Sequence, residues 1–339
     1  MVYPPLTKVI FKYIKCSVND MVLLIVSLWV LFLLFALAVS SEFLAKGSEI
    51  LEKKFGSGFT GSVIFGFITM LPELIFVLVA VKKMEYDVAL GSAVGGNILL
   101  FTVGFGMVIL VAYYKHKEII TLPITMKDDL WYLLIATLYI LFTSLKGSFT
   151  IIDGIILILL YVIFVTHQYI ETRRLEQEAE EETTPRQWAM SITFIVIGAI
   201  GLLITAEPFV DSIIEVSNLT GISSLILALI ISPIASELPE KISAFSLSSK
   251  SLKGAEVAVA NFIGSKVQAS TLLFGTMIIY KLAFKGASFY IGSKFTQLLV
   301  AVLTTLVGVL VAYDLRLKLT EGILVTLLYI VSVAVEFVI

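Results

Sequence analysis

The chain has 339 residues, of which 58% are hydrophobic and only 15% are charged, and its net charge is -2. A soluble domain carries about 25% charged residues, so the surplus of apolar side chains must face lipid. The charge gives no sign of a nucleic-acid partner, the single Cys16 excludes an intramolecular disulfide, and two histidines are too few for a zinc site.

Apolar stretches long enough to cross a bilayer, which takes about 20 residues, occur ten times along the chain. The first follows a short N-terminal segment, 1–20, and it is read as a span because it continues apolar to Ser40 without a clear cleavage site. In chain order the predicted spans are 21–41, 59–81, 88–113, 129–146, 151–170, 188–210, 221–246, 254–281, 290–313 and 319–338. This pattern predicts an all-α, multi-pass protein of the cell membrane.

The strongly polar stretch 171–187 divides the chain into two parts, 21–170 and 188–339, with five predicted spans each. The two parts resemble one another at three places. IDGIILILLYV from Ile152 recurs as TEGILVTLLYI from Thr320, the triplet LPE at 71–73 recurs at 238–240, and the segment 90–97 matches 259–266, at offsets of 168, 167 and 169 residues.

Near-equal offsets indicate an internal duplication. Because each half has an odd number of spans, the second copy must enter the membrane upside down. The sequence therefore predicts two inverted repeats of five helices, the arrangement of many secondary transporters, whose substrate sites lie near the midplane between the repeats.

The distribution of Lys and Arg outside the spans predicts the orientation. Thirteen lie on the side that carries the 171–187 linker, and eight lie on the opposite side. Since the richer side is normally cytoplasmic, we expect the linker in the cytoplasm and both termini outside.

Glu73 and Glu240 lie within apolar spans, where a carboxylate costs at least about 2.5 kcal/mol and usually faces a cavity, a partner or an ion. Each follows a proline, Pro72 or Pro239, and we expect each helix to break or kink there because proline leaves a carbonyl oxygen without its donor. Carboxylates beside freed carbonyls would form an all-oxygen site of the kind that Ca2+ prefers. One such glutamate could simply bond a neighbouring helix, but two matching Leu-Pro-Glu triplets favour an ion site.

Further oxygen donors cluster near these two glutamates. Some precede them by about one helical turn, and others lie on the following spans among small residues that let helices approach closely. The candidates are Thr69, Ser236 and Glu237 before the glutamates, and Ser92, Asn97, Asn261, Ser265 and Gln268 on the following spans. The serines and asparagines could equally join helices by hydrogen bonds.

The two repeats read GFITMLPEL followed by ALGSAVGGNILLFTVG, and ISPIASELPEK followed by VAVANFIGSKVQASTLLFG. On these segments the chain resembles the Ca2+/cation antiporter superfamily, which contains the sodium/calcium and proton/calcium exchangers. The resemblance covers the whole chain in helix count and is specific over the two repeats. It implies that Glu73 and Glu240 are the central ligands and that Thr69, Asn97 and Ser236 occupy ion-coordinating positions.

The sequence departs from the sodium-coupled pattern at several positions. Met70 and Glu237 stand where those members usually carry Ser, Lys266 stands where an Asn or Asp is common, and Gln268 is closer to the proton-coupled branch. We expect the ammonium of Lys266 to act as an internal cation paired with Glu237 or Glu240, unless the side chain snorkels to the membrane surface.

Together these features predict a secondary antiporter that exchanges Ca2+, or a similar divalent cation, for Na+ or H+ by alternating access. Its partners would be inorganic cations and the lipid bilayer, with no resident cofactor. Proton coupling is the first alternative to sodium coupling, and a cation channel is a second, less favoured because paired carboxylates at the midplane suit alternating access better. The H-E-x-x-H, G-x-S-x-G and Walker A motifs are missing from the sequence, so we do not expect an enzyme.

Overall fold

The protein is described here from a computed structural model, which covers residues 6–55, 59–175, 184–285 and 289–338. Within these residues the chain is almost entirely helical, with four two-residue strands in the connections. The elements of the first half are α1 (Leu6–Phe55), α2 (Phe59–Lys82), α3 (Tyr86–Leu99), the π-helix η1 (Leu100–Gly104), α4 (Phe105–His116), β1 (Ile120–Thr121), α5 (Met126–Lys146), β2 (Ser148–Phe149) and α6 (Ile151–Leu175).

The second half repeats this order of elements with one additional short 3-10 helix. It consists of α7 (Pro185–Thr220), α8 (Ser224–Lys250), α9 (Leu252–Gln268), the π-helix η2 (Ala269–Leu273), α10 (Phe274–Lys285), β3 (Phe289–Tyr290), the 3-10 helix η3 (Gly292–Lys294), α11 (Phe295–Ala312), β4 (Arg316–Leu317) and α12 (Leu319–Val338).

Eight helices in the described part of the chain are long and apolar enough to cross a membrane, which confirms a multi-pass membrane protein. They coincide with eight of the predicted spans. The other two, 59–81 and 221–246, fall on α2 and α8, the helices that carry the Leu-Pro-Glu triplets, and Ser224–Leu238 forms a shorter apolar stretch of α8. Large apolar side chains on the outer helices, such as Leu28 and Phe35 of α1, are more than half exposed, as contact with lipid requires.

Helix α2 runs without a break through Pro72, and α8 runs without a break through Pro239. The break expected at each proline is therefore wrong, and a kink there stays a prediction. Proline removes a single backbone hydrogen bond, and the hydrogen bonds on either side are enough to hold a helix together when neighbouring helices pack against it.

The irregular backbone lies instead in the third and eighth predicted spans. There η1 separates α3 from α4, and η2 separates α9 from α10. In each, a threonine hydroxyl donates to the carbonyl four residues earlier, Thr102 to Ile98 at 2.6 Å and Thr271 to Val267 at 2.5 Å. Single-turn π-helices of this kind are frequent at functional sites.

The connections gather at the two ends of the bundle. At one end β1 pairs with β4, and the His116 ring Nε2 lies 3.0 Å from the carbonyl oxygen of Ser248. At the other end β2 pairs with β3, and Lys83 forms ion pairs with Glu207 and Asp211 of α7. Each strand pair therefore joins one strand from each half of the chain.

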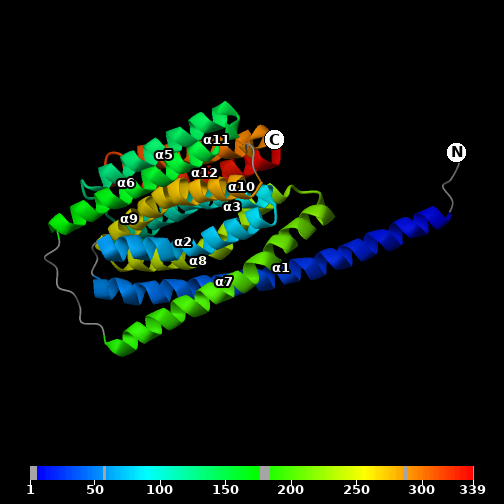
Figure 1. The fold of residues 1–339 in the computed structure, drawn as a ribbon, viewed down its shortest axis with the longest axis horizontal. Coiled ribbons are helices and arrows are strands. Elements are labelled where there is room, and N and C mark those ends of the chain that lie inside the picture. The colour runs from blue at the N-terminus through cyan, green and yellow to red at the C-terminus, as the bar shows by residue number, and fades with distance from the viewer. Residues whose placement is uncertain (1–5, 56–58, 176–183, 286–288, 339) are drawn as a thin grey trace.

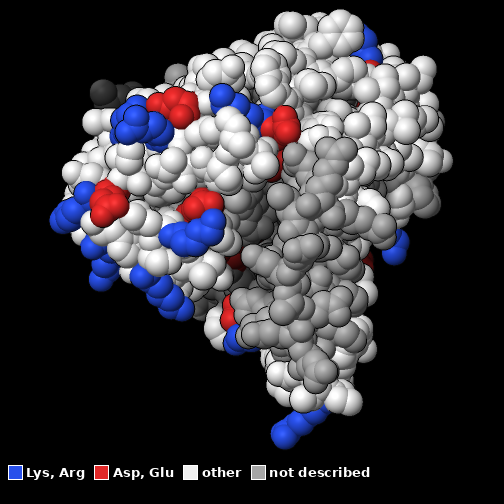
Figure 2. Space-filling view, turned by 90° about the vertical axis from the view of Figure 1, so that its left-hand side faces the viewer, with Lys and Arg blue, Asp and Glu red and all other residues white. Residues whose placement is uncertain are grey.

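Helices α1 and α7 lie side by side along one edge of the bundle, with the start of α1 and the end of α12 toward the right in Figure 1. The end of α6 and the start of α7 lie at the opposite, left-hand end. Figure 2 looks onto that end and shows Lys and Arg side chains among Asp and Glu, scattered over an otherwise uncharged surface.

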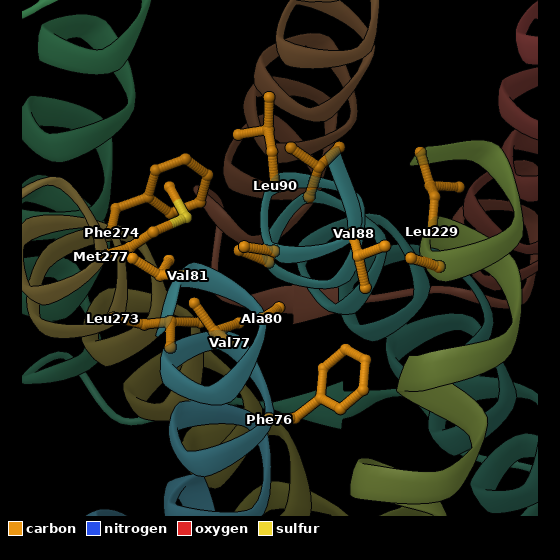
Figure 3. Close-up of a cluster of buried hydrophobic side chains, with 14 of the residues drawn as sticks. Phe76, Val77, Ala80, Val81, Val88, Leu90, Leu229, Leu273, Phe274 and Met277 are labelled. Atoms are coloured by element: carbon orange, nitrogen blue, oxygen red, sulfur yellow. The ribbon is translucent and has the colours of Figure 1, made fainter. Parts of the chain in front are cut away.

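The core between the helices is built from branched and aromatic side chains (Figure 3). Phe76, Val77 and Val81 of α2 are buried in one cluster with Leu273, Phe274 and Met277, and the same cluster reaches α3 and α8. This packing holds α2 against the segments of the second half that carry candidate site residues. The two helices with the Leu-Pro-Glu triplets, α2 and α8, therefore lie close together inside the protein.

Candidate cation site

A small cavity lies between α2, α3 and α8. Its volume is about 20 Å³, room for roughly one water-sized particle. The lining residues are Met70, Glu73, Gly96, Asn97, Leu100, Ser236, Glu237, Glu240, Ser265 and Ala269. Six of the candidate residues from the sequence therefore meet at one place: Glu73, Asn97, Ser236, Glu237, Glu240 and Ser265. The side chain of Thr69 lies outside the described residues.

Glu240 projects from α8 and is held by two donors from α9. The Asn261 amide donates to its Oε1 at 3.1 Å, and the Ser265 hydroxyl donates to the same oxygen at 2.9 Å. Asn261 thus contacts the central carboxylate of the second half rather than lining the cavity itself. These bonds fix the orientation of Glu240, which itself lines the cavity.

Glu73 projects from α2 and is buried, and its Oε1 has no hydrogen-bond partner among the described residues. This oxygen and Oε1 of Glu237 both lie where a Cβ on Gly96 would stand, each closer than 3.0 Å. Two carboxylates therefore point at one glycine. A buried carboxylate oxygen without a donor is costly, and a cation in the cavity would satisfy it.

Asn97 adds a third kind of oxygen. Its amide nitrogen donates to the carbonyl of Ala93 at 2.9 Å, which leaves the buried Oδ1 without a partner among the described residues. Since Asn97 lines the cavity, this oxygen is available to a ligand there. Gln268 is also buried with an unpartnered Oε1, but it lies outside the lining of the cavity.

Lys266 is fully buried, so the expectation that it might snorkel to the membrane surface is wrong. Its ammonium donates to the backbone carbonyl of Asn97 and lies 5.4 Å from the ring centre of Phe101. The expected ion pair of Lys266 with Glu237 or Glu240 is also wrong. The ammonium of Lys266 contacts the carbonyl of Asn97 instead, and the ion-pair partner of Glu237 is a different lysine. Lys266 nevertheless remains within the electrostatic reach of Glu237 and Glu73.

The lysine that pairs with Glu237 is Lys241, one turn further along α8, and both side chains are buried. Lys241 was not among the residues predicted from the sequence. The signal was present, since Lys241 follows the Leu-Pro-Glu triplet directly and stands four residues after Glu237, the spacing at which opposite charges meet on a helix. Its stem reaches toward Gly104 at the end of η1.

The charged neighbours of Glu73 are thus two further carboxylates, Glu237 and Glu240, and two ammonium groups, Lys241 and Lys266. Although three carboxylates line the cavity, no three acidic, histidine or cysteine side chains of the described residues converge as a metal-binding group. A bound cation would therefore need the neutral oxygens of Asn97 and Ser236 as well.

Comparison with known proteins finds similar proteins over most of the chain. Residues 25–170 and 190–338 match the family model described as sodium/calcium exchanger protein. An uncharacterized membrane protein of Methanocaldococcus jannaschii is 24% identical over 308 residues, 89% of this chain and 94% of the relative. The inner membrane protein YrbG of Escherichia coli is 25% identical over 70% of this chain and 74% of its own length.

Two solved structures share the fold. The crystal structure of the H+/Ca2+ exchanger CAX superposes with a TM-score of 0.81 at 22% identity, covering 98% of this chain and 93% of that one. The sodium-calcium exchanger NCX_Mj superposes with a TM-score of 0.62 at 22% identity, covering 92% and 99%. The match of the family model to both halves confirms the resemblance seen in the repeats, and the chain belongs to the sodium/calcium exchanger family of membrane cation antiporters.

Proposed function

We propose that this protein is a secondary antiporter that exchanges Ca2+, or a similar divalent cation, for Na+ or H+ by alternating access, with Glu73 and Glu240 as the central ligands. The observation that carries the proposal is the meeting of these two glutamates, one from each half, at one small cavity. The unpartnered oxygens of Glu73 and Asn97 add the acceptor groups that a hard cation requires.

Alternating access would follow from two inverted repeats of five helices around this cavity. The repeated order of elements and the two mixed strand pairs support that arrangement.

The packing around two glycines at matching positions of the two halves also supports it. A Cβ on Gly95 of α3 would collide with the backbone of Leu229 in α8, whereas a Cβ on Gly264 of α9 would have no atom of the described residues within 4 Å. Such a difference between matching positions is compatible with two repeats that rock against one another around a fixed site.

Proton coupling is the alternative that we keep. The overlap is greater with a solved structure titled as a H+/Ca2+ exchanger than with one titled as a sodium-calcium exchanger, but both identities are 22%, so this comparison concerns the fold. A cation channel is less favoured because the cavity has room for about one particle and is lined by paired carboxylates, which suit alternating access better than conduction.

The deciding experiment is 45Ca2+ uptake into proteoliposomes containing the purified protein. One set of vesicles carries an outward Na+ gradient, a second carries an outward proton gradient, and a third carries neither. Uptake driven only by Na+ or only by H+ identifies the coupling ion. Uptake of Ca2+ that is equal in all three sets would contradict antiport, and the Glu73→Gln protein serves as the control for leak.

We also propose that both termini lie outside and that the 171–187 linker lies in the cytoplasm. With Cys16 replaced by Ser, single cysteines at Lys83 and at Lys253 lie on opposite ends of the bundle. A membrane-impermeant maleimide added to intact cells should label Lys83→Cys and spare Lys253→Cys. The reverse pattern would invert the proposed orientation.

A further inference from the structure

The cation site contains positive charges of its own. Glu73, Glu237 and Glu240 bring three formal negative charges, and Lys241 and Lys266 bring two formal positive charges, so the formal net charge of this cluster is -1. The sum does not depend on where protons sit inside the cluster, because moving a proton from an ammonium to a carboxylate leaves the total unchanged.

The two lysines are part of the built structure and not chance neighbours. Lys241 is 5% exposed and Lys266 is 0% exposed, so neither can reach water to be screened. The ammonium of Lys241 is held by the carboxylate of Glu237, and that of Lys266 by the carbonyl of Asn97. Each ammonium group therefore contacts an oxygen atom of a residue that lines the cavity, Glu237 for Lys241 and Asn97 for Lys266.

The first half shows what the site would be without one of these charges. In the matching Leu-Pro-Glu segment, Leu74 stands where the second half has Lys241, and Met70 stands where it has Glu237. Lys266 similarly stands where the first half has Asn97. All the fixed ammonium groups of the cluster thus come from the second half.

On the basis of the proposed function, we propose that Lys241, together with Lys266, sets the cation selectivity of this site by acting as a built-in counter-ion. A fixed positive charge opposes a bound cation in proportion to the charge of that cation. Each lysine therefore lowers the affinity for Ca2+ by about the square of the factor by which it lowers the affinity for Na+. The site at net charge -1 matches one singly charged cation, and Ca2+ is bound weakly enough to be released.

The test is equilibrium binding of 45Ca2+ and 22Na+ to the purified protein in detergent, which does not depend on transport. Lys241→Leu copies the first half. We expect it to raise Na+ affinity about threefold and Ca2+ affinity about tenfold, because the effect scales with ionic charge. Lys266→Met removes the second ammonium and leaves the Glu237–Lys241 pair intact, so it gives the same readout if Lys241→Leu does not fold.

A double variant separates charge from packing. Glu237→Met with Lys241→Leu removes both partners, keeps the net charge at -1 and copies the apolar pair of the first half, a replacement that buried ion pairs often tolerate. It should bring the ratio of Ca2+ to Na+ affinity back toward that of the wild type. Lys253→Met, at an exposed lysine on α9 paired with Glu256, is the matched control and should leave both affinities unchanged.

The two proposals fail in different ways. If Lys241→Leu and Lys266→Met change both affinities by the same factor, or change neither, while Glu73→Gln still abolishes binding, the selectivity role is wrong and the cation site stands. If the wild type binds neither cation, or Glu73→Gln binds both normally, the proposed cation site itself is wrong.

Discussion

Glu73 and Glu240 occupy matching places in the two halves of the chain, yet their surroundings differ. Glu240 receives hydrogen bonds from Asn261 and Ser265, whereas Glu73 has an unpartnered oxygen that faces Gly96. The repeat alignment explains the difference, since Gly96 stands at the position of Ser265. A hydroxyl donor in one half is replaced by space in the other, and that space admits a second carboxylate, Glu237. Duplicated sequence therefore gives one central glutamate that is held by two donors, and one whose Oε1 has no hydrogen-bond partner among the described residues.

Helix packing differs between the halves in the same way. Gly95 lets α3 press against the backbone of α8, whereas its counterpart, Gly264, has no neighbouring atom within 4 Å of its Cβ position in the part of the chain that the structure describes. The two repeats are thus alike in sequence but differ in their helix contacts. We expect such a difference if the two halves exchange their packing arrangements during transport.

The largest expected effect comes from the two central glutamates. Glu73→Gln or Glu240→Gln should abolish cation exchange, because each removes a ligand charge and changes almost no volume. Transport in proteoliposomes and a thermal melt of the purified protein are the measurements. Glu215→Gln, at an exposed carboxylate on α7, is the control and should transport normally. Near-normal exchange in both single variants would mean that these glutamates are not the ligands.

Next in size is the contrast between the two glycines. Gly95→Ala should destabilise the protein by about 1–3 kcal/mol, since a methyl group cannot fit against the backbone of Leu229. Gly264→Ala should leave the melting temperature nearly unchanged because its surroundings are open. If α9 must close on α2 during transport, Gly264→Ala should still slow exchange. Equal stability losses in the two variants would refute the packing difference.

A smaller effect is expected from the donor that distinguishes Glu240. Ser265→Ala removes one of the two hydrogen bonds to Glu240. We therefore expect the cation affinity to fall by roughly tenfold or less, in line with a bond to a charged group worth about 1.5 kcal/mol. Asn261→Ala should act in the same direction, and the two substitutions should be non-additive because they share one acceptor oxygen. Equilibrium binding of 45Ca2+ checks both, and additive losses would speak against the shared acceptor.

The last comparison lies away from the cation site, in the first turns of α6 and α12, and we expect it to affect stability rather than transport. Asp153 is buried and accepts hydrogen bonds from Tyr139, Lys146 and Thr150, whereas its counterpart, Glu321, is partly exposed and accepts from Lys318. Asp153→Ala should therefore lower stability by about 1–3 kcal/mol. Glu321→Ala should cost less than about 1 kcal/mol, since exposed pairs contribute little. Thermal melts of the two variants compare them directly, and a larger loss in Glu321→Ala would reverse the expected order.

Much of the architecture follows from the sequence because lipid imposes simple requirements. Apolar stretches of sufficient length give the helices, and this prediction is confirmed for eight of them. The repeated Leu-Pro-Glu triplets indicate the family, and the family model confirms it. The duplicated register also pointed to Asn97, and the helical turn before Glu240 pointed to Ser236 and Glu237. The structure places all three at the same cavity as Glu73 and Glu240. Their role as ligands stays a prediction.

Other features depended on contacts between segments far apart in the chain. The sequence could not show that Glu237 pairs with Lys241 rather than Lys266, because the choice depends on which helix face each side chain occupies once α8 and α9 pack. Nor could it show that Gln268 lies outside the cavity, or that the prolines leave their helices unbroken. Sequence fixes which polar groups enter the membrane, since each must find a partner there, but only the tertiary structure decides which partner each one meets.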